Sequence, residues 1–203
     1  EMDARGLLLL IGCFGIPGGF GNEDIRYLLQ VSHIKSISGA LRRSSVLMAK
    51  IPEIIEGLVQ QNMEVDAVHI AFTFGIEDRF NPQNLLTSFL LDSEETLKKM
   101  KEKSQGSLAA VHEAKKKHLF ALTSVIKCLK LHNIDPSKLL PAWKINEKIM
   151  ALEKEIAGFD KQKRKKSSRR SKNKKARHSC ILQDNTTAGH SYPTCSQCGK
   201  NHP

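Results

Sequence analysis

Residues 50–59 have the sequence Lys-Ile-Pro-Glu-Ile-Ile-Glu-Gly-Leu-Val. The apolar side chains of this stretch recur at the positions that share one face of an α-helix, and they are Ile51, Ile54, Ile55, Leu58 and Val59. Pro52 stands where the first turn of a helix tolerates proline, because the N–H group that proline lacks would have no partner there. The stretch therefore predicts a helix that begins near Lys50.

Helix signals recur on both sides of this stretch. Apolar side chains at helical spacing predict a short helix over about residues 65–75 and a long one over residues 108–129, with a break at residues 104–107 before the long helix. Further helix starts are indicated by capping residues followed by acids or proline, at Asn22-Glu23-Asp24, Asn81-Pro82 and Asp135-Pro136. Because no segment alternates apolar and polar residues for long enough to predict a strand, we expect an all-α, multi-helix domain.

Charge and hydrophobic residues divide the chain near residue 160. Residues 1–160 hold 20 Lys and Arg against 20 Asp and Glu, whereas residues 161–177 hold 11 basic residues and no acid. The net charge of +11 therefore belongs to a tail, which excludes a basic nucleic-acid-binding fold. Hydrophobic residues number 73 in the first 160 positions and 8 in the last 43. We expect a globular domain over residues 1–160 and a disordered basic tail over residues 161–203.

Membrane and secretory signals are lacking in the sequence. No run of about 18 apolar residues is present, and the apolar segment Leu7–Ile16 follows acidic residues where a signal peptide needs positive charge. The five cysteines are odd in number and scattered, which favours a reducing compartment; they are Cys13, Cys128, Cys180, Cys195 and Cys198.

A glycine-rich stretch lies between Gly12 and Gly21. It matches neither the dinucleotide-binding pattern nor the triphosphate-binding pattern. A phosphate would also be repelled by Glu23 and Asp24 at the start of the following helix. We therefore expect a sharp turn between two helices, with Pro17 fixing the bend.

Histidines of the first 160 residues give no sign of a catalytic or metal site. Each is isolated in the sequence, without a cysteine or paired carboxylate at ligand spacing; they are His33, His69, His112, His118 and His132. Because no nucleophile, base and orienting group can be assembled from these positions, the sequence predicts no enzymatic activity and no cofactor.

The last helix of the domain, over residues 144–160, has a different apolar pattern. Its apolar positions follow intervals of 4, 3, 4 and 3, which is typical of a coiled-coil seam; they are Ile145, Ile149, Leu152, Ile156 and Phe159. Two interpretations remain open. The stripe packs on its own domain, or it binds the helix of a protein partner.

The basic run has the composition of a nuclear localisation signal. Its two clusters are Lys163-Arg164-Lys165-Lys166 and Arg169-Arg170. We expect a nuclear-import receptor to bind the run and to place the protein in the nucleus. The same charges would bind nucleic acid nonspecifically and with strong salt dependence, but without aromatic side chains they would not stack on bases. A solvated charged tail is the alternative.

The chain ends with zinc-ligand spacing. Cys195, Cys198 and His202 supply three of the four ligands that zinc needs. About ten residues here resemble the start of a CCHC zinc knuckle of the retrotransposon Gag type. With three ligands only, we expect no stable metal site from these residues.

Six ordered stretches between about residues 5 and 158 carry a family resemblance. They are Leu8–Pro17, Ile37–Ser44, Pro52–Gly57, Phe72–Phe80, Leu85–Leu90 and Asp135–Pro141. Together they resemble the FRIGIDA-like family of plant proteins.

That resemblance implies an all-helical central domain of a non-enzymatic nuclear scaffold. Such proteins act with transcriptional and chromatin partners, and with related family members, to raise expression of a floral repressor and so delay flowering. The family's coiled-coil segments fit the seam from Ile145 to Phe159. After Asp160 the sequence departs from the pattern expected of the family. The alternative function is nucleic-acid binding through the basic tail and the knuckle-like end.

Overall fold

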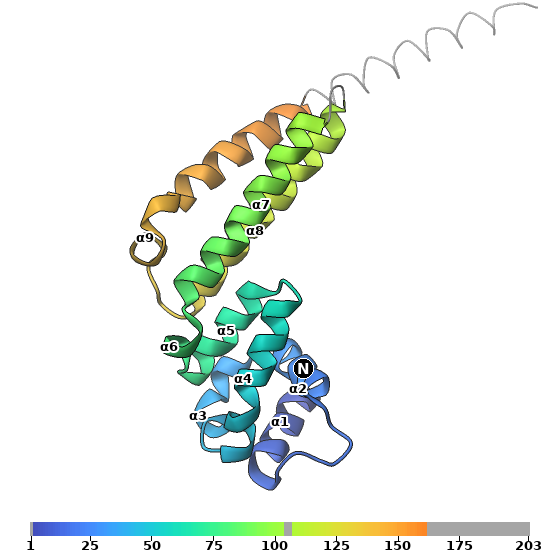
Figure 1. Cartoon of the computed structure of the whole chain (residues 1–203), viewed down its shortest axis with the longest axis vertical. Coiled ribbons are helices and arrows are strands. Elements are labelled where there is room, and N and C mark those ends of the chain that lie inside the picture. Colours follow the sequence, from blue (N-terminus) through green and yellow to red (C-terminus); the bar gives the residue numbers. More distant parts are fainter. Residues whose placement is uncertain (1, 104–106, 162–203) are drawn as a thin grey trace, which may run out of the picture. The chain divides into compact units, whose positions relative to one another are not determined.

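The computed structural model describes residues 2–103 and 107–161 of the chain. Within these residues it contains helices and connecting turns and no strand, so the all-α prediction is confirmed (Figure 1). The helices are α1 (Met2–Phe14), α2 (Asn22–Val31), the 3-10 helix η1 (Ile34–Ser36), α3 (Ser38–Leu41), α4 (Ser45–Gln60), α5 (Glu64–Phe74), α6 (Glu77–Phe80), α7 (Pro82–Lys103), α8 (Leu108–Leu131), α9 (Pro136–Leu139) and the 3-10 helix η2 (Pro141–Trp143). Residues 145–161 are helical as well.

Two compact units divide the chain. The first covers Glu1–Lys154, and the second begins at Glu155, of which residues 155–161 are described. Among the described residues, no helix has both the length and the apolar character needed to cross a membrane.

The stretch at residues 50–59 lies in the centre of an apolar core built from α1 to α5. We call this the first core. Its buried members are Leu8, Ile11, Ile25, Leu28, Leu29, Ile34, Leu41, Leu47, Ile51, Ile54, Ile55, Leu58, Ala67, Ile70, Ala71 and Phe74. The helical face predicted for residues 51–58 is therefore the buried face of α4.

The start of α4 differs from the prediction. The helix begins at Ser45, and the hydroxyl of Ser44 accepts a hydrogen bond from the Leu47 amide at 3.3 Å. Pro52 therefore lies inside the helix, where it removes one intrahelical hydrogen bond. The helix begins five residues before Lys50, because Ser44 caps it there and burial of Leu47 extends its apolar face toward the N-terminus.

The predicted caps are otherwise correct to within one residue. In α2 the cap is Gly21 and Asn22 is the first helical residue. The side-chain amide of Asn22 donates a hydrogen bond to the Glu53 carboxylate of α4 at 3.0 Å. The Asn81 side chain accepts a hydrogen bond from Asn84 N–H at 3.1 Å, and that of Asp135 accepts one from Ser137 N–H at 2.9 Å.

The glycine-rich stretch connects α1 to α2 as a turn, as predicted. Gly15 has a φ of +93°, which favours glycine. Phe20 N–H donates to the Pro17 carbonyl at 2.9 Å and closes the bend. The apolar run that precedes the turn is helical and forms part of α1.

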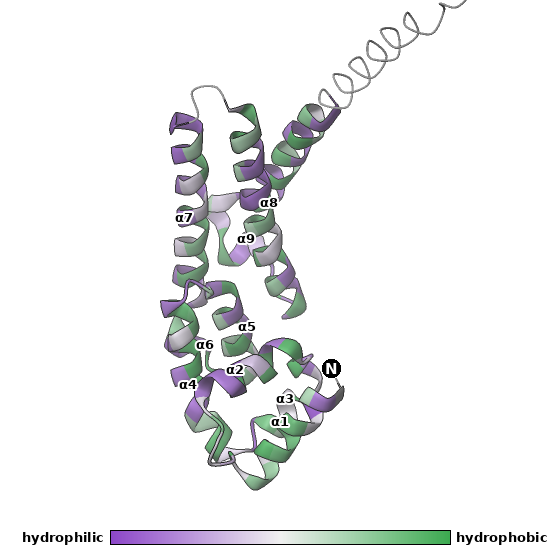
Figure 2. Ribbon diagram, turned by 90° about the vertical axis from the view of Figure 1, so that its right-hand side faces the viewer, coloured by the Kyte–Doolittle hydropathy of each residue, from purple (hydrophilic) through white to green (hydrophobic). Residues whose placement is uncertain are grey.

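A second core lies between α5, α7, α8 and the residues that follow α8. Its buried members are Val68, Leu86, Leu90, Leu122, Val125, Ile126, Cys128, Leu129, Leu140, Trp143 and Ile145. The two long helices α7 and α8 run side by side, and α5 packs against both of them (Figures 1 and 2). Because α5 also supplies Ile70 and Phe74 to the first core, it carries apolar side chains on two faces.

Arg42, in the segment after α3, donates hydrogen bonds to the C-terminus of α5. Its Nε donates to the Thr73 carbonyl at 2.8 Å, and its Nη2 donates to the Phe72 carbonyl at 3.3 Å. These carbonyls belong to the last turn of a helix and have no intrahelical partner. A cation is also favourable at this negative end of the helix dipole. The helix stops at Gly75, close to the end that the sequence predicted, and Gly75 has a left-handed φ of +71°.

Candidate functional site

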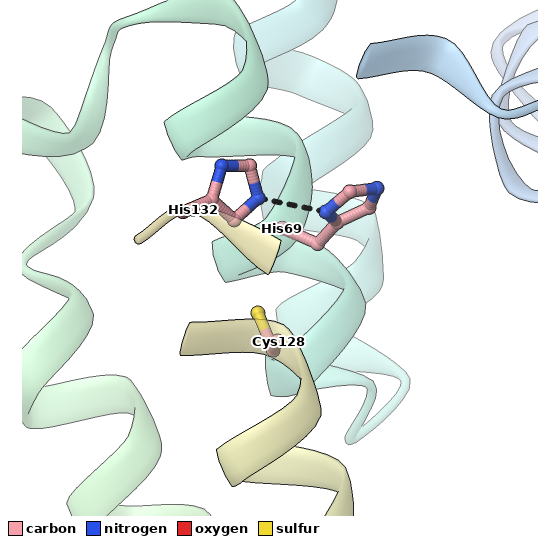
Figure 3. A group of neighbouring side chains, drawn as sticks. All are labelled: His69, Cys128 and His132. Carbon is pink, nitrogen blue, oxygen red and sulfur yellow. Dashed lines mark hydrogen bonds between the residues drawn. The ribbon is translucent and has the colours of Figure 1, made fainter. Parts of the chain in front are cut away.

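Two histidines and a cysteine meet at the edge of the second core. His69 lies on α5, Cys128 lies on the last turn of α8, and His132 directly follows α8. One potential ligand atom from each side chain lies within 4.8 Å of the other two. Nδ1 of His69 is 2.9 Å from Nε2 of His132, and this hydrogen bond is the dashed line in Figure 3. Figure 3 also shows the sulfur of Cys128 directed toward the pair.

Local geometry and packing each contribute part of this cluster. Cys128 and His132 are four residues apart at the end of one helix, so their side chains lie on the same face. His69 is 63 residues from His132 and reaches it because α5 packs against α8. The prediction that the histidines are isolated is therefore wrong for His69 and His132. The Cys-x3-His spacing at residues 128–132 was the local signal that could have revealed part of the cluster.

Polar groups of α2, η1, α5 and α8 surround the cluster. The Cys128 thiol donates to the Val65 carbonyl, with a distance of 3.7 Å between Sγ and oxygen. Asp66 lies one helical turn before His69, and its carboxylate accepts a hydrogen bond from the Gln30 amide at 3.2 Å. The ammonium group of Lys35 donates a hydrogen bond to the Leu131 carbonyl at the end of α8.

Burial keeps the three groups neutral near pH 7. It raises the pKa of the Cys128 thiol to about 12, with a smaller contribution from the carboxylate of Asp66. Burial, together with the neighbouring His69 and Lys35, lowers the pKa of His132 to about 4. The pKa of His69 is lowered by burial against the opposing effect of Asp66. A protonated thiol is a poor nucleophile, so the arrangement does not make an activated cysteine.

Solvent reaches the cluster at His69. One cleft of about 230 Å³ is lined by Leu29, Gln30, Asp66, His69 and Ile70. A second hollow of about 490 Å³ extends from His69 along residues 32–36 to Leu131. The imidazole of His69 therefore lies between the buried cysteine and two surface hollows.

The coiled-coil-like stripe packs partly on its own unit. Ile145 is buried in the second core, and Ile149 and Leu152 are half-buried against it. Ile156 and Phe159, which belong to the second unit, are half-buried. Packing on the domain thus accounts for the first three positions of the stripe. Partner binding by this helix stays a prediction.

The remaining sequence-predicted sites lie outside the described residues. These are the nuclear-localisation residues Lys163, Arg164, Lys165, Lys166, Arg169 and Arg170, and the zinc-knuckle-like residues Cys195, Cys198 and His202. Import-receptor binding, nucleic-acid binding and metal binding by these residues stay predictions.

Known proteins resemble most of the chain. A family model described as Frigida-like protein matches residues 1–182. Protein FRIGIDA of Arabidopsis thaliana is 42% identical over 167 residues, which is 82% of this chain and 27% of that protein. FRIGIDA-like protein 3 of the same plant is 29% identical over 154 residues, covering 76% of this chain and 27% of the relative. The family match continues beyond Asp160, where the sequence patterns had predicted a departure from the family.

A solved structure has the same helical fold. It is described as the crystal structure of the FRIGIDA flowering-time regulator and is 47% identical, with a TM-score of 0.73. The match covers 79% of this chain and 56% of the solved chain. This chain thus spans about a quarter of the length of the curated relatives named above.

Proposed function

Because this chain belongs to the family of Frigida-like proteins, we propose that it is a non-enzymatic nuclear scaffold that controls flowering time by binding transcriptional and chromatin partners. The match to the family over residues 1–182 is the observation that carries the proposal. A 47% identical structure described as a flowering-time regulator supports it. The neutral thiol of Cys128 agrees with a binding function rather than with nucleophilic catalysis.

A plant test addresses the proposed role in flowering. The chain is expressed in Arabidopsis thaliana that lacks functional FRIGIDA, and flowering time is scored with and without prior cold. We expect later flowering that cold treatment reverses. Unchanged flowering, in plants where the protein accumulates in the nucleus, would contradict the proposed role.

The helix over residues 145–161 is the proposed partner-binding element. Ile149 and Leu152 are held partly by the second core, so their substitution would also disturb the fold. Ile156 and Phe159 continue the stripe and are half-buried, which makes them the better test positions. Met150 lies off the stripe on the same helix and is 69% exposed. It therefore provides a matched control for a charge on this helix.

The partner experiment compares two variants of the full chain. We expect Ile156→Asp with Phe159→Asp to lose binding to a related family member in a pull-down, because two charges would be desolvated in the seam. Met150→Asp should bind like the parent, and circular dichroism should show equal helix content in all three proteins. Equal capture by the double variant would remove the seam from the proposal.

Nuclear localisation is proposed to depend on the basic run. A fluorescent fusion in which Lys163, Arg164, Lys165 and Lys166 are alanine should lose nuclear enrichment, since an import receptor binds these charges. A fusion with Lys115, Lys116 and Lys117 changed to alanine removes charge from α8 instead and should stay nuclear. Persistent enrichment of the first fusion would assign import to another segment or to a partner.

Nucleic-acid binding is the second candidate function, favoured by the 11 basic residues and absence of acids at residues 161–177. Deletion of this run should abolish retention on DNA or RNA at low salt, because these charges supply the contacts to phosphate. Retention by a protein that lacks the run would contradict this candidate.

A further inference from the structure

The cluster at the edge of the second core has the donor set of a transition-metal site. Two imidazole nitrogens and one sulfur lie within 4.8 Å of one another on elements of one compact unit. Zinc bonds of about 2.0–2.1 Å to nitrogen and 2.3 Å to sulfur place tetrahedral ligand atoms roughly 3.3–3.6 Å apart. The two ring nitrogens are 2.9 Å apart, and no two of the three ligand atoms are more than 4.8 Å apart. Small side-chain rotations would therefore bring all three atoms to bonding distance.

We propose that His69, Cys128 and His132 bind a transition-metal ion, with Zn²⁺ the ion that best matches their chemistry. Imidazole and thiolate are the ligands that zinc prefers over the oxygen ligands of Mg²⁺ and Ca²⁺. Cys128 exchanges its thiol proton for the metal, and the proton passes to solvent. Three protein ligands leave a fourth tetrahedral position for a water molecule.

Surrounding charges and access agree with this assignment. The thiolate and the nearby carboxylate of Asp66 together balance a divalent ion, while Lys35 places a positive charge near the histidines. The cleft lined by Gln30, Asp66 and His69 offers a path by which a hydrated ion reaches the site. Coordination of one ion by His69 and by Cys128 and His132 would join α5 to the end of α8. The bound ion would thereby stabilise the second core.

This inference does not depend on the proposed role in flowering. It concerns residues 69, 128 and 132, whereas the test of partner binding changes residues 156 and 159. A metal site can therefore be present or absent whatever the partners are.

Cobalt(II) is the probe for the experiment, because a tetrahedral thiolate site gives Co²⁺ a near-ultraviolet charge-transfer band and intense visible bands. The full chain carries Cys195→Ser and Cys198→Ser, so that the knuckle-like end adds no thiolate ligand. After treatment with a chelator, this parent is titrated with Co²⁺ and then with Zn²⁺. We expect both bands to saturate at one equivalent of Co²⁺ and to disappear when Zn²⁺ displaces it.

Matched variants locate the site. Cys128→Ala should lose the charge-transfer band, while Cys13→Ser, which changes an exposed cysteine of α1, should keep it. His69→Gln should weaken binding and abolish the rise in melting temperature that Zn²⁺ gives the parent. Circular dichroism of each metal-free variant separates loss of binding from loss of fold. His118→Gln, at a histidine outside the cluster, should respond to Zn²⁺ like the parent.

Three results would overturn the proposal. They are the absence of Co²⁺ bands in the folded metal-free parent, persistence of the charge-transfer band in Cys128→Ala, and a Zn²⁺-induced rise in melting temperature that survives in His69→Gln. Binding of Cu⁺ without binding of Co²⁺ or Zn²⁺ would overturn the assignment of zinc.

Discussion

The two cores of the first unit differ in chemical character. Every buried member of the first core is apolar and lacks a titratable group. The second core contains Cys128, and its edge holds His69 and His132. In the part of the chain that the structure describes, the histidines other than His33 lie on α5, on α8 or directly after α8. The first core therefore holds no group that titrates, whereas the second should also respond to pH and to metal ions.

Truncation in the first core should have the largest effect. Ile55 is fully buried on α4, so Ile55→Ala should lower the free energy of unfolding by about 3 kcal/mol through lost burial and a residual cavity. Urea unfolding followed by circular dichroism measures the loss. The control is Val46→Ala on the same helix, where the side chain is 47% exposed and the expected change is below about 0.5 kcal/mol. Similar losses of stability in the two variants would contradict the burial of Ile55 in the first core.

Removal of the arginine that bonds to the C-terminus of α5 should have an intermediate effect. Arg42→Ala leaves the carbonyls of Phe72 and Thr73 without their charged donor and should cost about 1–2 kcal/mol. Arg43→Ala removes a neighbouring exposed arginine and should change stability little. Thermal unfolding of both variants tests the difference. Equal melting temperatures would mean that Arg42 does not stabilise the end of α5.

Acidification should act on His118, which bonds α8 to α7, and should have the smallest effect of the three. His118 bonds to the Ser93 hydroxyl at 2.9 Å, and burial lowers its pKa, with Glu94 opposing and Lys148 and Lys101 adding to the shift. The folded state thus binds a proton less readily than the unfolded state. The contribution of His118 is fully present above the unfolded pKa of about 6.5 and is lost as the pH falls below it.

The free energy of unfolding is measured at pH 7.5 and pH 5.5. These two values lie about one unit above and about one unit below the pKa of histidine in the unfolded state. His118→Asn keeps an acceptor for Ser93 but does not titrate, so it should lose less stability on acidification than the parent. Ile55→Val changes the first core only and should lose as much stability on acidification as the parent. If His118→Asn also matched the parent, His118 would not contribute to the acid sensitivity.

Sequence patterns predicted the helices better than the site. The turn at Pro17, the helix end at Gly75 and the caps at Asn81 and Asp135 depend on residues within one helical turn of each other. The Pro52 signal predicts a start of α4 that is too late, because proline is typical of a first turn but here lies inside the helix. Its true start depends on the Ser44 cap and on burial of Leu47, which is a tertiary property.

Contacts between residues far apart in the sequence could not be predicted from those patterns. Arg42 lies 31 residues from Thr73, and His69 lies 63 residues from His132, so neither pairing has a local signature. For the stripe from Ile145 to Phe159, the sequence pattern predicts the apolar spacing but not which surface the stripe contacts. In the structure, Ile145, Ile149 and Leu152 of this stripe pack on the second core.

The sequence by itself determined the all-α class, the order of the helices, the neutral character of residues 1–160 and the resemblance to a plant protein family. These properties follow from periodicity, capping and composition, which act over a few residues. The tertiary structure decided that α5 serves two cores and that its histidine meets a cysteine and a histidine at the end of α8. Such contacts depend on which helix faces pack together, because packing brings together residues that are far apart along the chain.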